Sequence, residues 1–363
     1  MKIVHVISTL NIGGAENFVM QLANQQSYEN SVVIVITGIT DGNKNYIDKI
    51  DKKVTIYQLN WKQKYSLQQF FQLNSLLGKI EPTCVYVHLH NPLYYIYGVS
   101  LIKRKIKYVH TIHSSFDNWK GILKYLNKLR FLNNRILHVC VAKSIHEKLT
   151  HHFPKLRSTL INNGIRSYNP YRDLTQVKSF WNSFSIKPQI GKRFLAIGNI
   201  NRHKNYKILA QSFAKIYDSH PDAMCLHIGN EMDTVLSDEL KEINAPNLFL
   251  AGVKDNAADF LSEADALVVS SVQEGMPIVV LEALSMGVPI IATPAGGLVD
   301  VIVDGFNGFL IQDFKELSLR LAIKKFIALT LEEKQEMGIN AKAYFEENYD
   351  INKVSKIYKN KSA

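Results

Sequence analysis

Cysteine is scarce in this sequence and irregularly spaced. The 363 residues contain three Cys, which are Cys84, Cys140 and Cys225. An odd number of thiols at such wide separations fits neither a disulfide framework nor a zinc site. Each lies in an apolar, strand-like run, so we interpret all three as small buried hydrophobic side chains.

Long apolar runs are also absent. No segment approaches the roughly 20 apolar residues that a membrane-spanning helix requires. The first residues, MKIVHVISTLNIGGAE, contain a short apolar stretch, but they lack a small-residue cleavage site and carry His5 and Asn11. They predict a first β-strand and not a signal peptide, so the expected location is the cytoplasm.

The sequence further lacks the short motifs of several functional classes. It has no GxGxxG and no Walker motif, and its 12 His show no HExxH or other credible metal-ligand spacing. It has no RNP motif, helix-turn-helix signature or zinc finger. The sequence therefore requires no metal or cofactor, and no nucleic-acid-binding motif is recognisable.

The composition is that of a globular protein, with an uneven charge. Hydrophobic residues make up 46% and charged residues 21%, and the length suits two domains of about 100–200 residues each. Residues 1–180 hold 24 Lys and Arg against 9 Asp and Glu, a net charge of +15, whereas residues 181–363 hold 19 against 23, a net charge of −4. The basic front half indicates an anionic partner such as nucleic acid, a membrane surface or a phosphorylated substrate; a merely basic surface explains the charge equally well.

Short β-branched runs alternate with longer amphipathic segments, and this alternation occurs twice. The expected strands are 2–7, 31–36, 54–57, 83–88, 107–112, 136–141, 158–161, 193–197, 223–228, 247–250, 266–269, 288–292 and 308–311. The expected helices are 15–26, 65–79, 92–103, 119–133, 143–151, 204–218, 232–243, 256–263, 277–286 and 298–303, with further helices over 315–363. This order predicts an α/β protein with two doubly wound parallel sheets, each covered on both faces.

The alternation breaks over residues 166–191, which show no clear strand period. Ligands bind outside the carboxyl ends of the strands in doubly wound sheets, and two such domains facing one another would form a cleft. We therefore expect a first Rossmann-like domain at 1–167, a connection at 168–190, a second Rossmann-like domain at 191–345 and a final helix at 346–363 that packs back on the first domain.

The segment 270–297, SSVQEGMPIVVLEALSMGVPIIATPAGG, carries the strongest signal. Glu274 and Gly275 follow an apolar strand, and Pro277 is expected at the first helical position, where its missing N–H costs nothing. Gly287 ends the helix. The start of this helix presents unpaired backbone amides at a positive helix end, which suits a diphosphate. The residues expected there are Met276, Pro277, Ile278 and Val279.

This segment resembles the signature of the retaining glycosyltransferases of family 4, which have the GT-B fold of two facing Rossmann-like domains. Two Glu separated by seven residues, Glu274 and Glu282, match that signature, as does the surrounding EG-P----EA---G-P---T--GG pattern. The resemblance implies that Glu274 contacts the donor sugar, that Glu282 contacts the ribose and that the backbone between them holds the diphosphate. It covers almost the whole chain and is sharpest over 194–310.

A second segment, 194–209, ends a strand and opens a helix around a polar loop. Lys204 fits the Lys of the family pattern, but Asn199 stands where the family usually has Arg. Arg202 is a candidate to supply the missing guanidinium, and a plain surface charge is an equal alternative. Fixed cations here would stabilise the negative charge that builds on a departing diphosphate.

The first domain carries two further candidates. Gly13 and Gly14 follow a strand and open a helix, where a glycine pair lets backbone approach a phosphate; the sequence GGAE is a common form of the family's first loop. His90 and His113 each follow an apolar strand and would lie at the carboxyl edge of the sheet. The resemblance places His113 near the donor sugar, and histidine suits hydrogen bonding to hydroxyl groups.

Residues 118–136 combine apolar residues at helical spacing with several Lys and Arg on the other faces. Such a helix can lie on an anionic membrane surface, or its apolar stripe can simply pack on the sheet. The second alternative is favoured for the stripe, while the basic face could still attract a lipid diphosphate acceptor or its membrane.

The resemblance, together with these features, implies a retaining glycosyltransferase that moves a hexosyl-type sugar from a nucleotide-diphosphate sugar to an acceptor hydroxyl. UDP is the expected nucleotide because UDP sugars are prevalent donors in the family. A saccharide or lipid-linked acceptor in surface polysaccharide synthesis is expected by analogy. Glu274, His113 and Lys204 are the expected catalytic residues. A GT-B epimerase is one alternative, but epimerases lack this pair of Glu. A phosphorylase would need a pyridoxal-phosphate lysine and a longer chain. A non-catalytic nucleotide- or nucleic-acid-binding protein is an alternative of another class.

Overall fold

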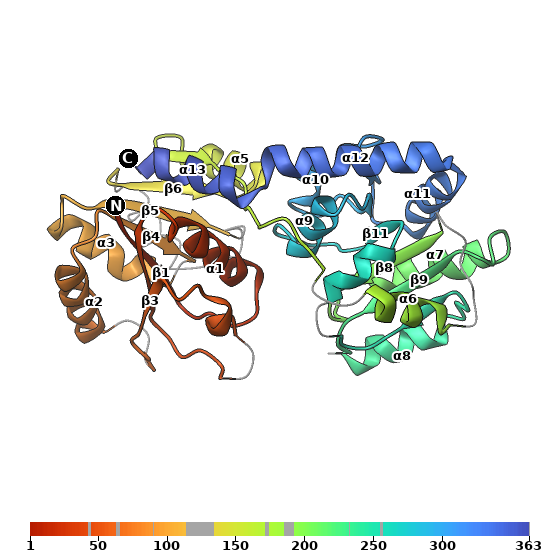
Figure 1. Ribbon diagram of the computed structural model, residues 1–363, viewed down its shortest axis with the longest axis horizontal. Coiled ribbons are helices and arrows are strands. Elements are labelled where there is room, and N and C mark those ends of the chain that lie inside the picture. Colours follow the sequence, from red (N-terminus) through yellow and green to blue (C-terminus); the bar gives the residue numbers. More distant parts are fainter. Residues whose placement is uncertain are drawn as a thin grey trace. The chain divides into compact units, whose positions relative to one another are not determined.

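The computed structural model describes residues 1–42, 45–62, 66–89, 91–113, 134–170, 174–184, 192–231, 233–254 and 257–362. These residues divide into two compact units. One is formed by Met1–Arg166 together with Asn348–Ala363, and the other by Ser167–Glu347 (Figure 1). Each unit is an α/β structure with its own parallel sheet.

The sheet of the first unit has the strand order β3-β2-β1-β4-β5-β6-β7, and all neighbouring strands are parallel. Its central strands are buried along almost their whole length, as the continuous apolar runs predicted. The strands are β1 (Lys2–Ile7), β2 (Ser31–Ile36), β3 (Val54–Gln58), β4 (Cys84–His88), β5 (Lys107–Ile112), β6 (Ile136–Cys140) and β7 (Ser158–Leu160).

Helices cover both faces of this sheet. Apolar side chains of α1 (Gly14–Gln26) and α13 (Ile351–Ser362) pack on one face. Those of α2 (Leu67–Ile80) and α3 (Leu93–Ile102) pack on the other. A short 3₁₀ helix, η1 (Ile47–Lys49), and α5 (Lys143–His152) complete the described helices of this unit.

The final helix belongs to the first unit in space, although it lies at the end of the chain. Tyr358 is buried against β4 and β5, where its hydroxyl lies 3.4 Å from that of Thr111 and its carbonyl accepts a hydrogen bond from the Tyr86 hydroxyl. The Ile165 amide donates to the Tyr349 carbonyl, and the Ile351 amide donates to the Ile165 carbonyl. These bonds join the start of α13 to the end of the segment Met1–Arg166. The C-terminal helix is therefore part of the core of the first unit.

The sheet of the second unit has the order β10-β9-β8-β11-β12-β13 and is also parallel throughout. The chain starts in the middle at β8, proceeds to one edge, and returns to the other side of β8 with β11. The strands are β8 (Arg193–Ile197), β9 (Met224–Ile228), β10 (Leu248–Leu250), β11 (Ala266–Val269), β12 (Ile290–Ala292) and β13 (Gly308–Leu310).

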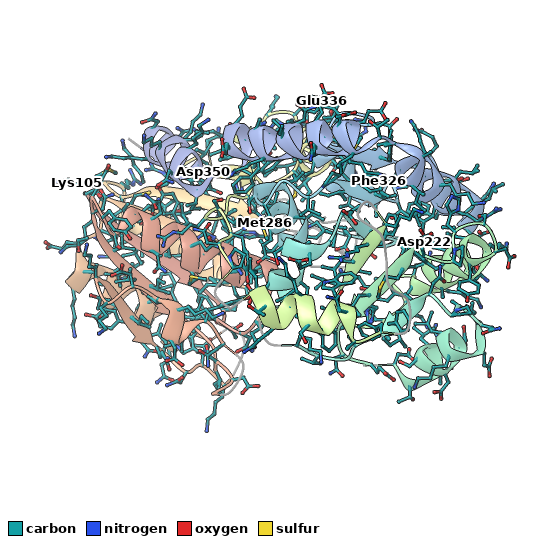
Figure 2. The ribbon with its side chains drawn as sticks, turned by 45° about the vertical axis from the view of Figure 1, so that its right-hand side comes forward. Lys105, Asp222, Met286, Phe326, Glu336 and Asp350 are labelled. Atoms are coloured by element: carbon teal, nitrogen blue, oxygen red, sulfur yellow. The ribbon has the colours of Figure 1, made fainter. Side chains whose placement is uncertain are left out.

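The core of the second unit includes the layer between its sheet and α7 (Tyr206–Tyr217) and α11 (Glu316–Ala328). Phe326 of α11 is fully buried there, with its ring centroid 5.8 Å from that of Phe194 (Figure 2). The remaining helices of this unit are α6 (Leu174–Asn182), α8 (Thr234–Glu242), η2 (Ala257–Glu263), α9 (Ile278–Ser285), α10 (Leu298–Val301) and α12 (Leu331–Asn348), whose last residue lies beyond the unit boundary.

Two details differ from the sequence-based expectations, and one lies outside the described residues. The expected connection 168–190 contains α6, which packs on η2 inside the second unit because Val177 and Trp181 bury an apolar stripe there. The expected helix 256–263 is the 3₁₀ helix η2. Most of the amphipathic segment 118–136 lies outside the described residues. No helix within the described ranges is both long and apolar enough to cross a membrane.

Both sheets have a point at which the chain leaves the middle strand in opposite directions. In the first unit this point lies between β1 and β4, and in the second between β8 and β11. Loops that leave the carboxyl ends of two such neighbouring strands diverge and leave a crevice between them, which is where ligands bind in open α/β sheets. The residues that follow these four strands are therefore the candidates for function.

Candidate functional site

The clearest constellation lies where β8 and β11 end in the second unit. Lys204 follows β8 and Glu274 follows β11. The Lys204 ammonium nitrogen lies 2.7 Å from Oε1 of Glu274, and the side chains are 23% and 11% exposed. The Ser271 hydroxyl donates to the same carboxylate oxygen at 2.6 Å. The fold thus joins two charged groups that are 70 positions apart in the sequence.

Hydrogen bonds within and between the two loops hold Lys204 in place. The Asn201 side chain accepts from the amides of His203 and Lys204, at 3.0 and 3.1 Å, which closes a tight turn. The Ser270 hydroxyl then donates to the Lys204 carbonyl at 2.8 Å, and the Val272 amide donates to the His203 carbonyl at 2.8 Å. The ammonium group is therefore positioned by both loops.

A second set of contacts supports the start of the β8 loop. The Gly198 carbonyl accepts from Nε2 of His227 at 2.9 Å and from the hydroxyl of Tyr206 at 3.2 Å. Burial, with a smaller contribution from the negative charge of Glu274, raises the pKa of Tyr206. Burial also lowers the pKa of His227. Both groups are therefore neutral near neutral pH, and each donates a hydrogen to the same carbonyl.

The start of α9 differs in one respect from the expectation. Pro277 is not the first helical residue: it has an extended conformation, with φ −67° and ψ 125°, and is the N-cap, so α9 begins at Ile278. A residue with ψ near 120° lies outside the helical region, so the helix cannot include Pro277. The amides of Ile278 and Val279 precede the first possible intrahelical hydrogen bond. They are the donors that this helix end offers, since proline has none.

The loop after β12 packs against the turn that carries Glu274. Gly296 has φ +53°, and a Cβ at this position would overlap the Glu274 carbonyl oxygen. The Gly297 amide donates to the Gly275 carbonyl at 2.9 Å. The Thr293 hydroxyl donates a further hydrogen bond to the Ser271 carbonyl. A side chain at position 296 would therefore displace the backbone that carries Glu274.

The structure separates the other residues expected in this unit. Gly275 is exposed, whereas the Met276 side chain is buried, so its backbone and not its side chain is available to a ligand. Glu282 lies half-buried on α9. Arg202 is exposed and lines a cavity of about 280 Å³ together with Lys207 and Glu239. Neither Lys204 nor Glu274 lines this cavity. The roles of Glu282 and Arg202 stay predictions.

In the first unit, the glycine pair forms the start of α1. Gly13 is the N-cap and Gly14 is the first helical residue, one position earlier than expected. The Glu16 carboxylate folds back over Gly13 and occupies the space of a Cβ there. Burial raises the pKa of Glu16, partly offset by a backbone hydrogen bond. A side chain at position 13 would therefore have to displace this carboxylate, and phosphate binding at this loop stays a prediction.

Histidines gather at the β1–β4 switch point of the same unit. His113 directly follows β5 and is partly exposed, while His5 and His88 are fully buried beside it. Nε2 of His113 lies 3.4 Å from Nδ1 of His88. His90, the other expected histidine, lies outside the described residues.

Several residues of these sites were not assigned a role from the sequence. Gly296 matched the family pattern without an assigned function. The signal that could have identified both Ser271 and Gly296 is their place in the loops that follow β11 and β12. His5 carried no signal in the sequence, because only the pairing of β1 with β4 brings it to His88. Tyr206 and His227 likewise meet only because β8 and β9 are neighbours.

Known proteins resemble both halves of the chain. Residues 12–167 match the family described as Glycosyltransferase Family 4, and residues 178–344 match the family described as Glycosyl transferases group 1. The N-acetyl-alpha-D-glucosaminyl L-malate synthase of Bacillus anthracis is 34% identical over 39% of this chain and 36% of its own length. The UDP-Gal:alpha-D-GlcNAc-diphosphoundecaprenol alpha-1,3-galactosyltransferase of Escherichia coli is 24% identical over 74% of this chain and 68% of its own.

Solved structures show the same fold. A glycosyltransferase from Rickettsia africae superposes with a TM-score of 0.84 at 16% identity, covering 99% of this chain and 97% of the other. HepE from Anabaena, in complex with UDP and glucose, superposes with a TM-score of 0.82 at 16% identity, covering 99% of both chains.

The first three curated relatives are matched over only 36%, 25% and 60% of their own lengths. The two family matches, in contrast, together include most of this chain: one contains strands β2 to β7 and the other contains strands β8 to β13. The chain therefore belongs to the family 4 glycosyltransferases, which have the GT-B fold.

Proposed function

We propose that this chain is a retaining glycosyltransferase that moves a hexosyl-type sugar from UDP to the hydroxyl of a saccharide or lipid-linked acceptor. The observation that carries the proposal is the Lys204–Glu274 pair, which lies at the β8–β11 switch point beside the open amino end of α9. This arrangement offers one cation and the backbone amides of Ile278 and Val279 to a diphosphate, and one carboxylate to a sugar.

Each group has a separate role in the proposed reaction. Lys204 and the amides of Ile278 and Val279 stabilise the diphosphate as the bond between its oxygen and the sugar C1 breaks. Glu274 holds the sugar hydroxyls, and Glu282 holds the ribose. His113 contacts the sugar, as the family resemblance implies. Arg202 and the Gly13–Gly14 loop are further candidates to bind the donor.

Retention follows in this scheme from attack on the face that the leaving group vacates. The acceptor oxygen forms its bond to C1 on that face, and its proton passes to the departing diphosphate. Proton NMR of the first product formed tests this step, because it reports the anomeric configuration before any equilibration. A product with inverted configuration would contradict the proposed mechanism.

The choice of UDP is supported by the HepE complex, which contains UDP and glucose. The experiment is a thermal-shift titration with UDP, GDP and ADP sugars, followed by measurement of nucleotide release with acceptor present. We expect the UDP sugar to give the largest shift. A larger shift with a GDP or ADP sugar would replace UDP in the proposal, and no shift with any of them would end the donor-site assignment.

No metal cofactor is included in the proposal, because Lys204 and the amino end of α9 supply positive charge at the diphosphate. Turnover is therefore expected to be the same in EDTA and in added magnesium. A loss of turnover in EDTA that magnesium restores would show that the site needs a metal ion.

The lipid-linked acceptor is supported by the printed name of the Escherichia coli relative, which specifies a diphosphoundecaprenol-linked acceptor for that protein. The first unit also has a strongly basic edge at the start of β5, β6 and β7. A cavity of about 460 Å³ lies there, and none of the described residues that line it is acidic. Its cations are Arg104, Lys107, Arg135, Arg157 and Lys361, with the exposed Lys105 beside them in the same loop as Arg104 (Figure 2).

A membrane surface rich in anionic lipid suits this edge by charge. Co-sedimentation with phosphatidylglycerol-containing vesicles, compared with phosphatidylcholine vesicles, tests the contact. The Arg104→Gln/Arg157→Gln variant is expected to lose most of this binding. Lys143→Gln/Lys148→Gln removes the same charge from the exposed face of α5 and is expected to keep it. Equal losses in both variants would show that only net charge matters.

A further inference from the structure

A row of three histidine rings leads from the surface of the first unit into its core. Nε2 of His113 lies 3.4 Å from Nδ1 of His88, and Nε2 of His88 lies 3.0 Å from Nδ1 of His5. Nε2 of His5 then lies 2.8 Å from Oε1 of Gln26 on α1. Four side chains from β1, β4, α1 and the end of β5 thus form one continuous hydrogen-bonded chain.

The two inner rings are neutral near neutral pH. Burial lowers the pKa of His5 to about 4, partly offset by its hydrogen bond to Gln26. Burial also lowers the pKa of His88 well below its usual value, and the neighbouring histidines lower it further. A neutral imidazole has one N–H donor and one bare acceptor nitrogen, so each ring must donate on one side and accept on the other.

The orientation of the Gln26 amide, with Oε1 towards His5 and Nε2 buried without a partner among the described residues, sets the direction of this hydrogen-bonded row. Because Oε1 only accepts, His5 donates through Nε2 and its Nδ1 is bare. His88 then donates through Nε2 to His5, which leaves the Nδ1 of His88 bare. His113 in turn donates through Nε2 to His88, so a neutral His113 ring has its lone pair on Nδ1.

We propose that Gln26, His5 and His88 are positioning residues that keep His113 in its Nε2–H form, so that Nδ1 accepts a hydrogen bond from a sugar hydroxyl. This inference rests on the proposed function, in which His113 holds the donor sugar. It also specifies the ligand group, because a bare nitrogen attracts a hydroxyl hydrogen and repels a phosphate oxygen.

The packing around the chain is consistent with a fixed geometry. Phe18, which is fully buried on α1, has its ring 5.7 Å from that of His113 and 6.4 Å from that of His88, edge-on in both cases. Phe18 and Gln26 are eight positions apart on α1, about two helical turns, and so lie on one face of the helix. One helix therefore supports the rings at one end and accepts the last hydrogen bond at the other.

The tautomer of His113 can be measured directly. Nitrogen-15 NMR separates N–H-bearing from bare ring nitrogens, and the His113→Gln variant identifies the His113 signals among the 12 His. We expect an N–H at Nε2 and a bare Nδ1 in the ligand-free wild-type protein near neutral pH. An N–H at Nδ1 would overturn the proposal, whatever the variants do.

The variant that tests the origin of the tautomer is Gln26→Met, which keeps the length of the side chain but removes its amide oxygen. The signals of the two His113 nitrogens are expected to move towards each other, because both directions of the chain become populated. The kcat/KM for the sugar donor should fall about two- to tenfold, the range that one net hydrogen bond is worth. The affinity for UDP alone, which lacks the sugar, should stay unchanged.

The matched control is Gln21→Met, which removes a hydrogen-bonding amide from the same helix outside the chain of histidines. It is expected to leave the His113 signals and kcat/KM unchanged. If Gln26→Met behaved like this control, Gln26 would not set the tautomer of His113, and the proposed function would stand. If His113→Gln kept full turnover, the sugar contact would fail, while the wild-type spectrum would still decide the tautomer.

Discussion

The ammonium nitrogen of Lys204 lies 2.7 Å from the Oε1 of Glu274, and both side chains are largely buried. A pair with this burial is positioned more firmly than an exposed ion pair, whose geometry is usually loose. Because Ser271 donates to the same oxygen, the carboxylate organises the β8 loop and the β11 loop together. The two charged groups are therefore positioned together, and variants of either residue are informative about both.

We expect Glu274→Gln to lose most turnover and to stay folded. The amide keeps the shape of the side chain but removes the charge that attracts Lys204 and a strong acceptor for sugar hydroxyls. A fall in kcat of about 10²–10³ is the scale observed when one preorganised active-site group is removed. Steady-state kinetics and circular dichroism measure the two expectations.

The control for this variant is Glu316→Gln. Glu316 is similarly buried, at 14% exposure, and its carboxylate contacts Lys215 and Arg320, both at 2.8 Å. Loss of these two ion pairs should lower the free energy of unfolding by about 1 kcal/mol and leave kcat unchanged. Equal kcat values for Glu274→Gln and the wild type would end the assignment of Glu274.

Lys204→Met should lower kcat by about a hundredfold, because the departing diphosphate loses its fixed cation. The double variant Lys204→Met/Glu274→Gln is expected to lose less than the product of the two single losses, since residues in contact are not energetically independent. Kinetics of all four proteins complete this cycle. Strict multiplication of the two losses would show that the residues act separately.

Gly296→Ala is expected to disrupt the site and to destabilise the second unit by more than about 4 kcal/mol, because the new Cβ overlaps the backbone of Glu274. Gly305→Ala is the matched control: Gly305 also has a positive φ, +76°, but open space around its Cβ position. It should cost only the left-handed conformation of alanine, about 1–2 kcal/mol. Urea unfolding and turnover of the two variants distinguish overlap from backbone strain.

Acid should destabilise the first unit through His5. Its pKa is about 4 in the folded protein and 6.5 when unperturbed. The unfolded chain therefore binds a proton between these values while the folded protein does not, so stability is complete above the unfolded value and falls as the pH decreases towards the folded value. The loss for this group between about pH 7 and about pH 5 is about 2 kcal/mol.

The His5→Phe variant measures this contribution. Its free energy of unfolding should depend less on pH over the same interval than that of the wild-type protein, because the buried ring can no longer be protonated after unfolding. Urea unfolding at both pH values gives the comparison. Parallel pH dependences of the two proteins would show that His5 does not carry this linkage.

Much of the fold could be predicted from the sequence because secondary structure has a local period. The apolar runs of β1 and β4, and the amphipathic repeats between them, depend only on residues a few positions apart. The same holds for the glutamate-bearing segment after β11, where strand, turn and helix follow each other directly. The position of Pro277 was predicted wrongly, because the fixed φ of proline suits both helical and extended backbone and does not show which ψ the residue adopts.

The sequence by itself determined the two α/β halves, the strand ends that carry function, and the identities of Lys204, Glu274 and His113 as candidates. Only the tertiary structure decided that Lys204 meets Glu274, that Gly296 lies under the turn, and that His5 and Gln26 connect to His113. The physical reason is strand pairing. Which strands become neighbours depends on burial and hydrogen bonding across the whole domain. The periodicity of apolar residues in the sequence does not show this order.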